Sequence, residues 1–171
     1  AVGFSKEQDY FSVHGTIATE RSFFDKNTTF NFSGTGSYDW IDPNNPGLSL
    51  ARPETGEKWS VELFGGLSQL LTRASAVQFT SSYKYSNGYL SDPYKAIRGI
   101  GPGDGILSDR RPSEKHQGNL MARYRHHFPF HDLFPASVHV DYRFYADDWA
   151  VTSHTFELAW HQGLASSKVC E

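Results

Sequence analysis

The sequence predicts an all-β fold of antiparallel strands in up-and-down order, and three observations support this prediction. The 171-residue chain is 15% aromatic and holds one Cys and one Met, a composition typical of β-proteins. Apolar and polar residues alternate with a period of two through most of the sequence, as in strands whose side chains point to opposite faces. Pro and Gly residues fall between the alternating segments, where strands are expected to end.

Composition and charge exclude several other classes of protein. The formal net charge of −3 argues against a strongly basic nucleic-acid binder and against a polybasic membrane-surface protein. A single Cys excludes an internal disulfide framework. No stretch approaches the ~18 consecutive apolar residues that a membrane-spanning helix needs. The high aromatic share excludes a disordered chain.

Seven segments show the alternation, and we expect each to be a strand, with no helix between them. The clearest is Thr29–Trp40, in which Phe30 and Phe32 lie on one face while Asn31 and Ser33 lie on the other. The seven segments are residues 10–23, 29–40, 59–68, 77–86, 119–128, 138–145 and 155–161.

The connections between these segments differ in length. Residues 25–27 and 73–75 are tight turns, and residues 129–135 and 146–152 are short. Residues 41–58 and 91–115 form long loops rich in Pro or Gly. Short turns at one end and long loops at the other are typical of outer-membrane barrels. We therefore predict that residues 1–171 form a single transmembrane β-barrel domain or a part of one.

Three details favour lipid over a protein core as the neighbour of the apolar faces. The longest segments exceed the ~5–6 residues of a typical soluble strand and match the ~9–11 that cross a bilayer. Charged residues lie in the middle of the polar faces, as expected in a water-filled lumen. Aromatic residues gather near the segment ends, where rings settle at the membrane–water interface. The interfacial aromatics that we single out are Trp40, Trp59, Tyr89 and Trp149.

Barrel closure sets a requirement that seven strands do not meet. Unpaired backbone groups cost several kcal/mol each in hydrocarbon, so open sheet edges do not occur there. Bacterial single-chain barrels accordingly close with an even number of strands. We expect the seven visible strands to be part of a larger barrel.

Three stretches carry a resemblance to a known family. They are Asn87–Lys95, then Arg110–Pro112 leading to Arg123–His126, then His139–Trp149 followed by Ser153–Leu158, with the segment ending in Asp147-Asp148-Trp149 as the most specific part. Their order and spacing resemble an uncharacterised bacterial family, domain of unknown function 3570, over roughly residues 55–165. The resemblance implies an outer-membrane β-barrel of a Gram-negative bacterium, longer than this chain and ending in an aromatic residue. It implies no known activity.

Charged residues on the polar faces are the main candidate for a functional site. They form a lumen charge ladder of Arg123, Arg125, Asp141, Arg143 and Glu157, with Glu62 and Lys84 on earlier strands. One interpretation is a set of cross-strand ion pairs that braces the lumen, and the other is a charged constriction that steers solutes. A catalytic dyad of Asp141 and Glu157 lacks a positioned nucleophile, so we expect no enzyme and no catalytic residue.

The eight His residues raise the question of a metal site. His126 and His127 point to opposite faces of one strand, so they do not share an ion without a bulge. His127 and His139 are the two candidates that we retain, although the pattern predicts no metal site and no cofactor.

The sequence as a whole predicts a porin-like, non-enzymatic protein of the bacterial outer membrane. It passes small solutes or ions, or it serves as a scaffold for a surface or periplasmic complex, with the lipid bilayer as partner and no nucleic acid. One alternative is a secreted soluble β-barrel or sandwich that binds a ligand such as a glycan through Trp40, Trp59 and Trp149. Another is a metal-handling surface protein that uses His126, His127, His131 and His139.

Overall fold

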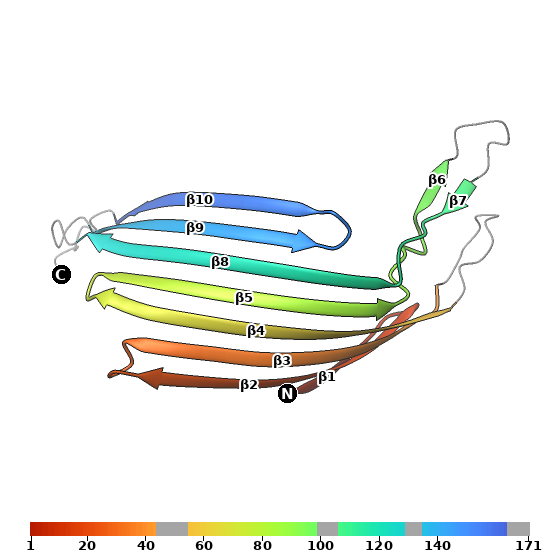
Figure 1. Cartoon of the computed structure of the whole chain (residues 1–171), viewed down its shortest axis with the longest axis horizontal. Helices are drawn as coiled ribbons and strands as arrows, with labels where there is room; N and C mark the ends of the chain where they lie inside the picture. The colour runs from red at the N-terminus through yellow and green to blue at the C-terminus, as the bar shows by residue number, and fades with distance from the viewer. Residues whose placement is uncertain (44–54, 99–105, 129–134, 164–171) are drawn as a thin grey trace, which may run out of the picture. The chain divides into compact units, whose positions relative to one another are not determined.

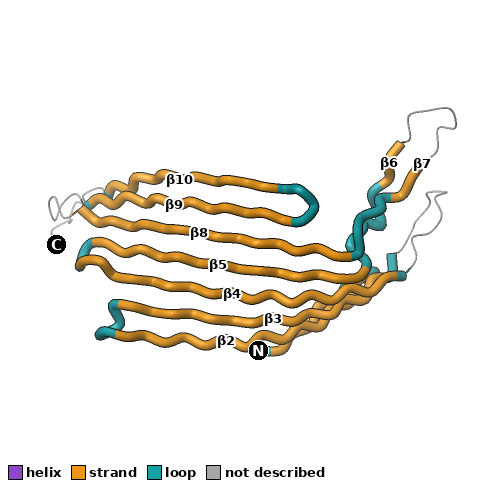
Figure 2. The backbone as a smooth tube through the Cα atoms, viewed as in Figure 1, coloured by secondary structure: helices purple, strands orange, loops and turns teal. Residues whose placement is uncertain are grey.

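Every regular element in the described part of the chain is a β-strand (Figure 2). The structure is a computed structural model that describes residues 1–43, 55–98, 106–128 and 135–163. No helix among these residues is long and apolar enough to span a membrane. The strands are β1 (Val2–Lys6), β2 (Tyr10–Phe23), β3 (Thr28–Ile41), β4 (Gly56–Thr72), β5 (Ser75–Gly88), β6 (Ala96–Arg98), β7 (Ile106–Ser108), β8 (Glu114–Phe128), β9 (Ala136–Asp147) and β10 (Thr152–Gln162).

Eight strands form one antiparallel sheet in the order β1-β2-β3-β4-β5-β8-β9-β10 (Figure 1). Each strand therefore pairs with its neighbour along the chain, except that β6 and β7 form a separate hairpin between β5 and β8. Among the described residues, no pairing joins β1 to β10, so the order is linear. The predicted all-β, up-and-down antiparallel fold is confirmed.

The seven predicted strands correspond to β2, β3, β4, β5, β8, β9 and β10. The prediction missed β1, a five-residue strand that pairs with β2 from Val2 opposite Gly15 to Lys6 opposite Phe11. It also missed the β6–β7 hairpin within the loop predicted at 91–115. The first predicted long loop is shorter than expected because β4 already begins at Gly56, and the second is shifted because β5 ends at Gly88 and β8 begins at Glu114.

The chain divides into two compact units, which are described separately below. Unit 1 comprises Ala1–Ile17, Gly34–Leu63 and Lys84–Gln117, and unit 2 comprises Ala18–Ser33, Phe64–Tyr83 and Gly118–Glu171. Each long strand of β2–β5 contributes one part to unit 1 and another part to unit 2.

The tight turns lie where the sequence places them. The β2–β3 turn uses Phe24, Asp25 and Lys26 in the left-handed region, with φ values of 52, 54 and 68°. In the β9–β10 turn, the Asp147 carboxylate accepts hydrogen bonds from the backbone N–H groups of Trp149 (3.1 Å) and Val151 (2.9 Å). An aspartate that bonds to the backbone two residues ahead is a common way to stabilise a turn.

The space around Gly88, at the end of β5 in unit 1, is too small for a side chain. Gly88 has φ of +119°, and a Cβ at this position would lie 2.1 Å from the carbonyl oxygen of Glu57. We expect Gly88→Ala to destabilise the fold by about 1–3 kcal/mol, because the left-handed strain adds to a clash with backbone. The measurement is the midpoint of urea unfolding of the refolded protein.

Gly36→Ala is the matched control, because a Cβ at Gly36 meets no atom within 4 Å. Its midpoint should stay near that of the unmodified chain. An equal loss in the two variants would contradict the assignment of the cost to the Gly88 backbone.

Candidate functional site

The two sides of each strand differ in how much of their side chains they expose. In β3, Phe30, Phe32 and Trp40 are exposed, while the alternating polar residues are half-buried or buried. Phe32 is 55% exposed, whereas Asp39 is only 3% exposed. We call the side of a strand with the exposed apolar residues its apolar face and the opposite side its polar face.

Burial in this structure is inverted relative to a protein with an apolar core. The buried polar residues are Ser12, Thr28, Asp39, Ser60, Ser75 and Ser86. Among the described residues, Ala136 is the buried hydrophobic residue. Exposed large apolar residues of the central strands include Phe30, Phe32, Trp40, Trp59, Val61, Leu63, Phe79 and Leu120.

In unit 1, hydrogen bonds and an ion pair connect the polar faces of β2, β3 and β4. The Ser12 hydroxyl donates to Asp39 (2.6 Å), and the Lys58 ammonium lies 3.0 Å from the other carboxylate oxygen of Asp39. Two residues further along each of β3 and β4, on the same face, the hydroxyls of Ser37 and Ser60 lie 2.7 Å apart. A carboxylate that is almost completely buried needs such partners to offset its desolvation.

In unit 2, the charged residues of β8 and β9 meet on the polar face. Arg125 binds Asp141 in a bidentate manner, with Nη2 2.9 Å from Oδ2, and Nε of Arg123 lies 3.5 Å from the same oxygen. Glu157 of β10 is directly opposite Asp141 in the register. Arg143 is opposite Thr155. Opposite charges therefore meet between β8 and β9, whereas two carboxylates meet between β9 and β10.

The two remaining residues of the predicted charge ladder, Glu62 and Lys84, lie in unit 1. Both side chains are half-buried on the polar faces of β4 and β5. Within the described residues, neither of them forms an ion pair. The charge ladder thus consists of a cluster of Arg123, Arg125 and Asp141 in unit 2 with Glu157 opposite it, a separate Arg143, and two separate charges in unit 1.

Aromatic rings on the apolar face of unit 1 contact one another across strands. Trp40 packs against Phe11 with ring centroids 5.4 Å apart and against Tyr38 at 4.7 Å. Trp59 packs edge-on against Tyr85 at 5.2 Å. Two of the predicted interfacial aromatics, Trp40 and Trp59, therefore belong to a cross-strand band of rings.

A second band of rings lies on the apolar face of unit 2. Phe23 and Phe30 are in edge contact at 5.9 Å, and Phe128 contacts His126 at 4.4 Å and Trp160 at 5.5 Å. This band lies near the tight β2–β3 turn and the end of β8. The apolar face of each unit therefore carries a group of contacting rings, and Phe32, Phe79 and Tyr142 are further aromatic residues on this face of unit 2.

The other two predicted interfacial aromatics lie just outside the strands. Tyr89 follows β5, and burial raises the pKa of its phenol, with a further increase from the carboxylates of Asp109 and Asp92. Trp149 lies in the β9–β10 turn, and its backbone N–H donates to Asp147.

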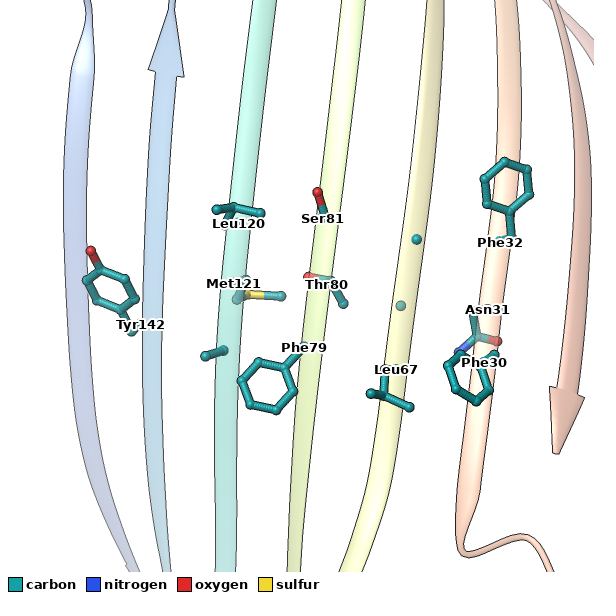
Figure 3. A pocket seen from close by; sticks show the side chains of 13 residues that line it. Phe30, Asn31, Phe32, Leu67, Phe79, Thr80, Ser81, Leu120, Met121 and Tyr142 are labelled. Atoms are coloured by element: carbon teal, nitrogen blue, oxygen red, sulfur yellow. The ribbon is translucent and has the colours of Figure 1, made fainter. Parts of the chain in front are cut away.

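The apolar face of unit 2 contains a hollow of about 640 Å³ (Figure 3). Phe30, Phe32, Phe79, Leu120 and Tyr142 surround it. Gly65, Ser81 and Ala122 lie on its floor, on the apolar faces of β4, β5 and β8. A surface of this kind offers apolar contact and few polar partners.

The described histidines lie on different faces and strands. No group of three or more His, Cys, Asp or Glu residues able to hold a metal ion occurs in the described part of the chain. His126 lies on the apolar face against Phe128, whereas His127 is exposed on the opposite face. His139 instead lies beside His161, with ring centroids 4.3 Å apart. The candidate His131 lies outside the described residues.

The sequence analysis missed two pairs of residues, although alternation places each member of the pairs on a polar face. Asp39 and Lys58 both occupy polar positions near the ends of consecutive strands. His139 and His161 both occupy polar positions of the β9–β10 hairpin. The missing information was the register, which decides which polar residues of neighbouring strands meet.

The carboxylates of Asp141 and Glu157 should respond differently to neutralisation. Asp141→Asn leaves Arg125 and Arg123 without their ion-pair partner, so we expect a loss of about 1 kcal/mol in unfolding free energy. Glu157→Gln removes a like charge opposite Asp141 and should leave stability unchanged or raise it. Urea unfolding of the two variants measures the difference, and equal losses would contradict the pairing.

The comparison with known proteins agrees with the resemblance noted in the sequence. No curated protein and no solved structure matches the chain. The sequence profile of a family described as "Protein of unknown function (DUF3570)" matches residues 1–171. The match includes the first 50 residues, in which the sequence analysis found only the strand pattern. The chain is therefore a member of the DUF3570 family.

Proposed function

We propose that this chain forms membrane-spanning strands of a bacterial outer-membrane β-barrel, with its apolar face against lipid and its polar face lining a water-filled passage for small solutes or ions. The observation that carries the proposal is the inverted burial. Large apolar side chains are exposed along the long strands, while Ser, Thr and Asp side chains are buried. The proposal assigns the protein no catalytic step.

Water is a poor solvent for the face that this sheet exposes. Soluble monomers rarely expose contiguous apolar patches of more than a few hundred Å². Here strands of unit 2 expose apolar residues around one hollow, such as Phe32, Phe79 and Leu120. Acyl chains remove the cost of this exposure, because contact with hydrocarbon replaces contact with water.

The lengths of the strands support a bilayer as the neighbour. The strands β2, β3 and β5 have 14 residues each, and β4 has 17. A tilted transmembrane strand needs ~9–11 residues to cross the hydrocarbon core. Each of these strands is therefore long enough to span a bilayer.

The proposal also requires hydrogen-bonded partners for the edge strands of the sheet. β10 has one partner, and the part of β2 beyond the β1 pairing has one partner within the described residues. A strand edge in hydrocarbon needs hydrogen-bond partners for its N–H and C=O groups. The barrel therefore needs partner strands at both edges to close.

The soluble glycan-binding alternative is less well supported. A β-sandwich would bury its apolar faces against a second sheet. Trp40 and Trp59, two of its three proposed ligand-contacting residues, pack against neighbouring rings of the same face. These contacts suit an aromatic girdle.

Membrane insertion is tested by a pair of arginine variants at adjacent positions of β4. Leu63 is exposed on the apolar face, and Glu62 is half-buried on the polar face. We expect Leu63→Arg to cost about 2–4 kcal/mol because the guanidinium enters hydrocarbon, whereas Glu62→Arg faces water and is tolerated. The measurement is outer-membrane fractionation together with heat-modifiable migration in detergent gels.

The unmodified chain should fractionate with the outer membrane and migrate faster before boiling than after it. A chain that stays soluble and monomeric without detergent would contradict the proposal. So would Leu63→Arg and Glu62→Arg variants that insert equally well.

Solute passage has its own test in planar bilayers. The purified full-length protein should produce discrete conductance steps, because the charged polar face lines water. Insertion without conductance would instead support the scaffold interpretation.

A further inference from the structure

A second hollow, of about 280 Å³, lies on the polar side of unit 2, where the β4–β5 turn meets β8 and β9. Its polar lining consists of guanidinium, imidazole and hydroxyl groups. These side chains include Arg73, Arg125, His127, His139, Ser75 and Ser137. No carboxylate lies among the described residues that line this hollow.

The turn that carries Arg73 is held in place by hydrogen bonds. The Thr72 hydroxyl lies 2.7 Å from that of Ser75 and accepts the backbone N–H of Ala74 at 3.1 Å. The carbonyl of Ala74 accepts the backbone N–H of His127 at 2.7 Å, which joins the turn to β8. Arg73 is exposed, and within the described residues its guanidinium forms no ion pair or hydrogen bond.

The neighbouring acid does not neutralise the hollow. Asp141 is bound by Arg125 through both guanidinium Nη atoms and also approaches Arg123. Two guanidiniums thus share one carboxylate, and this trio keeps a positive charge. The other acid, Glu157, lies on β10 opposite Asp141 and does not line the hollow.

The imidazoles favour an anion over a metal ion as the ligand. Among the described histidines, His139 and His161 are the two whose rings are in contact, with centroids 4.3 Å apart. A divalent cation at this pair would lie in the field of Arg125 without a carboxylate ligand from the hollow. An anion is attracted electrostatically by the guanidinium groups and accepts hydrogen bonds from imidazole N–H and hydroxyl groups.

We propose that this hollow is a binding subsite for the phosphate or carboxylate group of a small water-borne solute. The inference deepens the proposed function, on which it rests, by naming anionic solutes as the class that the polar face attracts. Arg73 supplies the unpaired guanidinium at the edge of the hollow, and Arg125 supplies a cation fixed by Asp141. The hydroxyls of Ser75 and Ser137 and the imidazole of His139 supply additional hydrogen bonds.

The experiment is a calorimetric titration of the full chain, refolded in detergent, with inorganic phosphate, and with citrate as the carboxylate probe. We expect binding of at least one of the two anions that weakens as salt increases. Arg73→Gln and His139→Gln should each weaken it about tenfold or more, since charge-assisted hydrogen bonds are among the strong ones. Lys26→Gln is the matched control, because it removes a cation from a different tight turn outside the hollow.

The outcomes separate this proposal from its competitors. Absence of binding to both anions, or an equal loss in Lys26→Gln, would overturn it. Binding of Ni²⁺ lost in His139→Gln, without anion binding, would overturn it in favour of a two-histidine metal site. Binding seen only in nanodiscs containing an anionic phospholipid would assign the site to a lipid headgroup and also overturn it.

Heat-modifiable migration of the same variants gives an independent readout of membrane insertion. Variants that insert normally but have lost anion binding support the subsite. If the unmodified chain fails to insert, the proposed function fails, whatever the titration shows.

Discussion

The side chains that hold the strands of this sheet to one another are polar. In a soluble β-protein, apolar side chains packed between sheets provide most of the stabilisation, and polar side chains face water. Here the contacts with buried or half-buried partners include those of Ser12 with Asp39, Lys58 with Asp39, and Arg125 with Asp141. The apolar side chains contact neighbours on the same face of the sheet, and their outer surfaces are exposed. Burial of apolar surface against protein therefore contributes little to the stability of the described sheet. In the proposed function, contact with acyl chains takes the place of an apolar core.

The strands could be predicted because alternation of a two-residue period is a local property of the sequence. Long segments such as Tyr10–Phe23, which has the same bounds in the structure, carry enough repeats to be recognised. β1 has only five residues, and β6 and β7 have three each, so their alternation does not stand out from that of a loop. The extended starts of β4 and β8 were missed for a related reason. Pairing with a neighbouring strand prolongs a strand into residues whose own preference is weak.

The face of each candidate residue could be predicted, but its partners could not. Alternation alone places Arg125, Asp141 and Glu157 on polar faces. Whether Asp141 meets a cation or another carboxylate depends on the register between strands, which turn geometry and pairing set over many residues. The structure gives Asp141 an arginine on one side and a glutamate on the other. The basic hollow beside the β4–β5 turn was missed for the same reason, since Arg73 and His139 are far apart in sequence.

Phe64 departs from the division between the faces, and its surroundings explain why. Phe64 alternates with Leu63 and Gly65 and so lies on the polar face of β4. A Cβ built on Gly66 would lie 3.5 Å from the Phe64 ring and 3.6 Å from Cβ of Asn31, so the ring borders the space that the glycine leaves open. Phe64 and Asn31 also line a hollow of about 400 Å³ together with Glu20. An aromatic ring that covers a glycine shields the backbone of the strand from water at a position where no side chain does so. Phe64 thus covers the strand backbone on the face that the proposed function assigns to water.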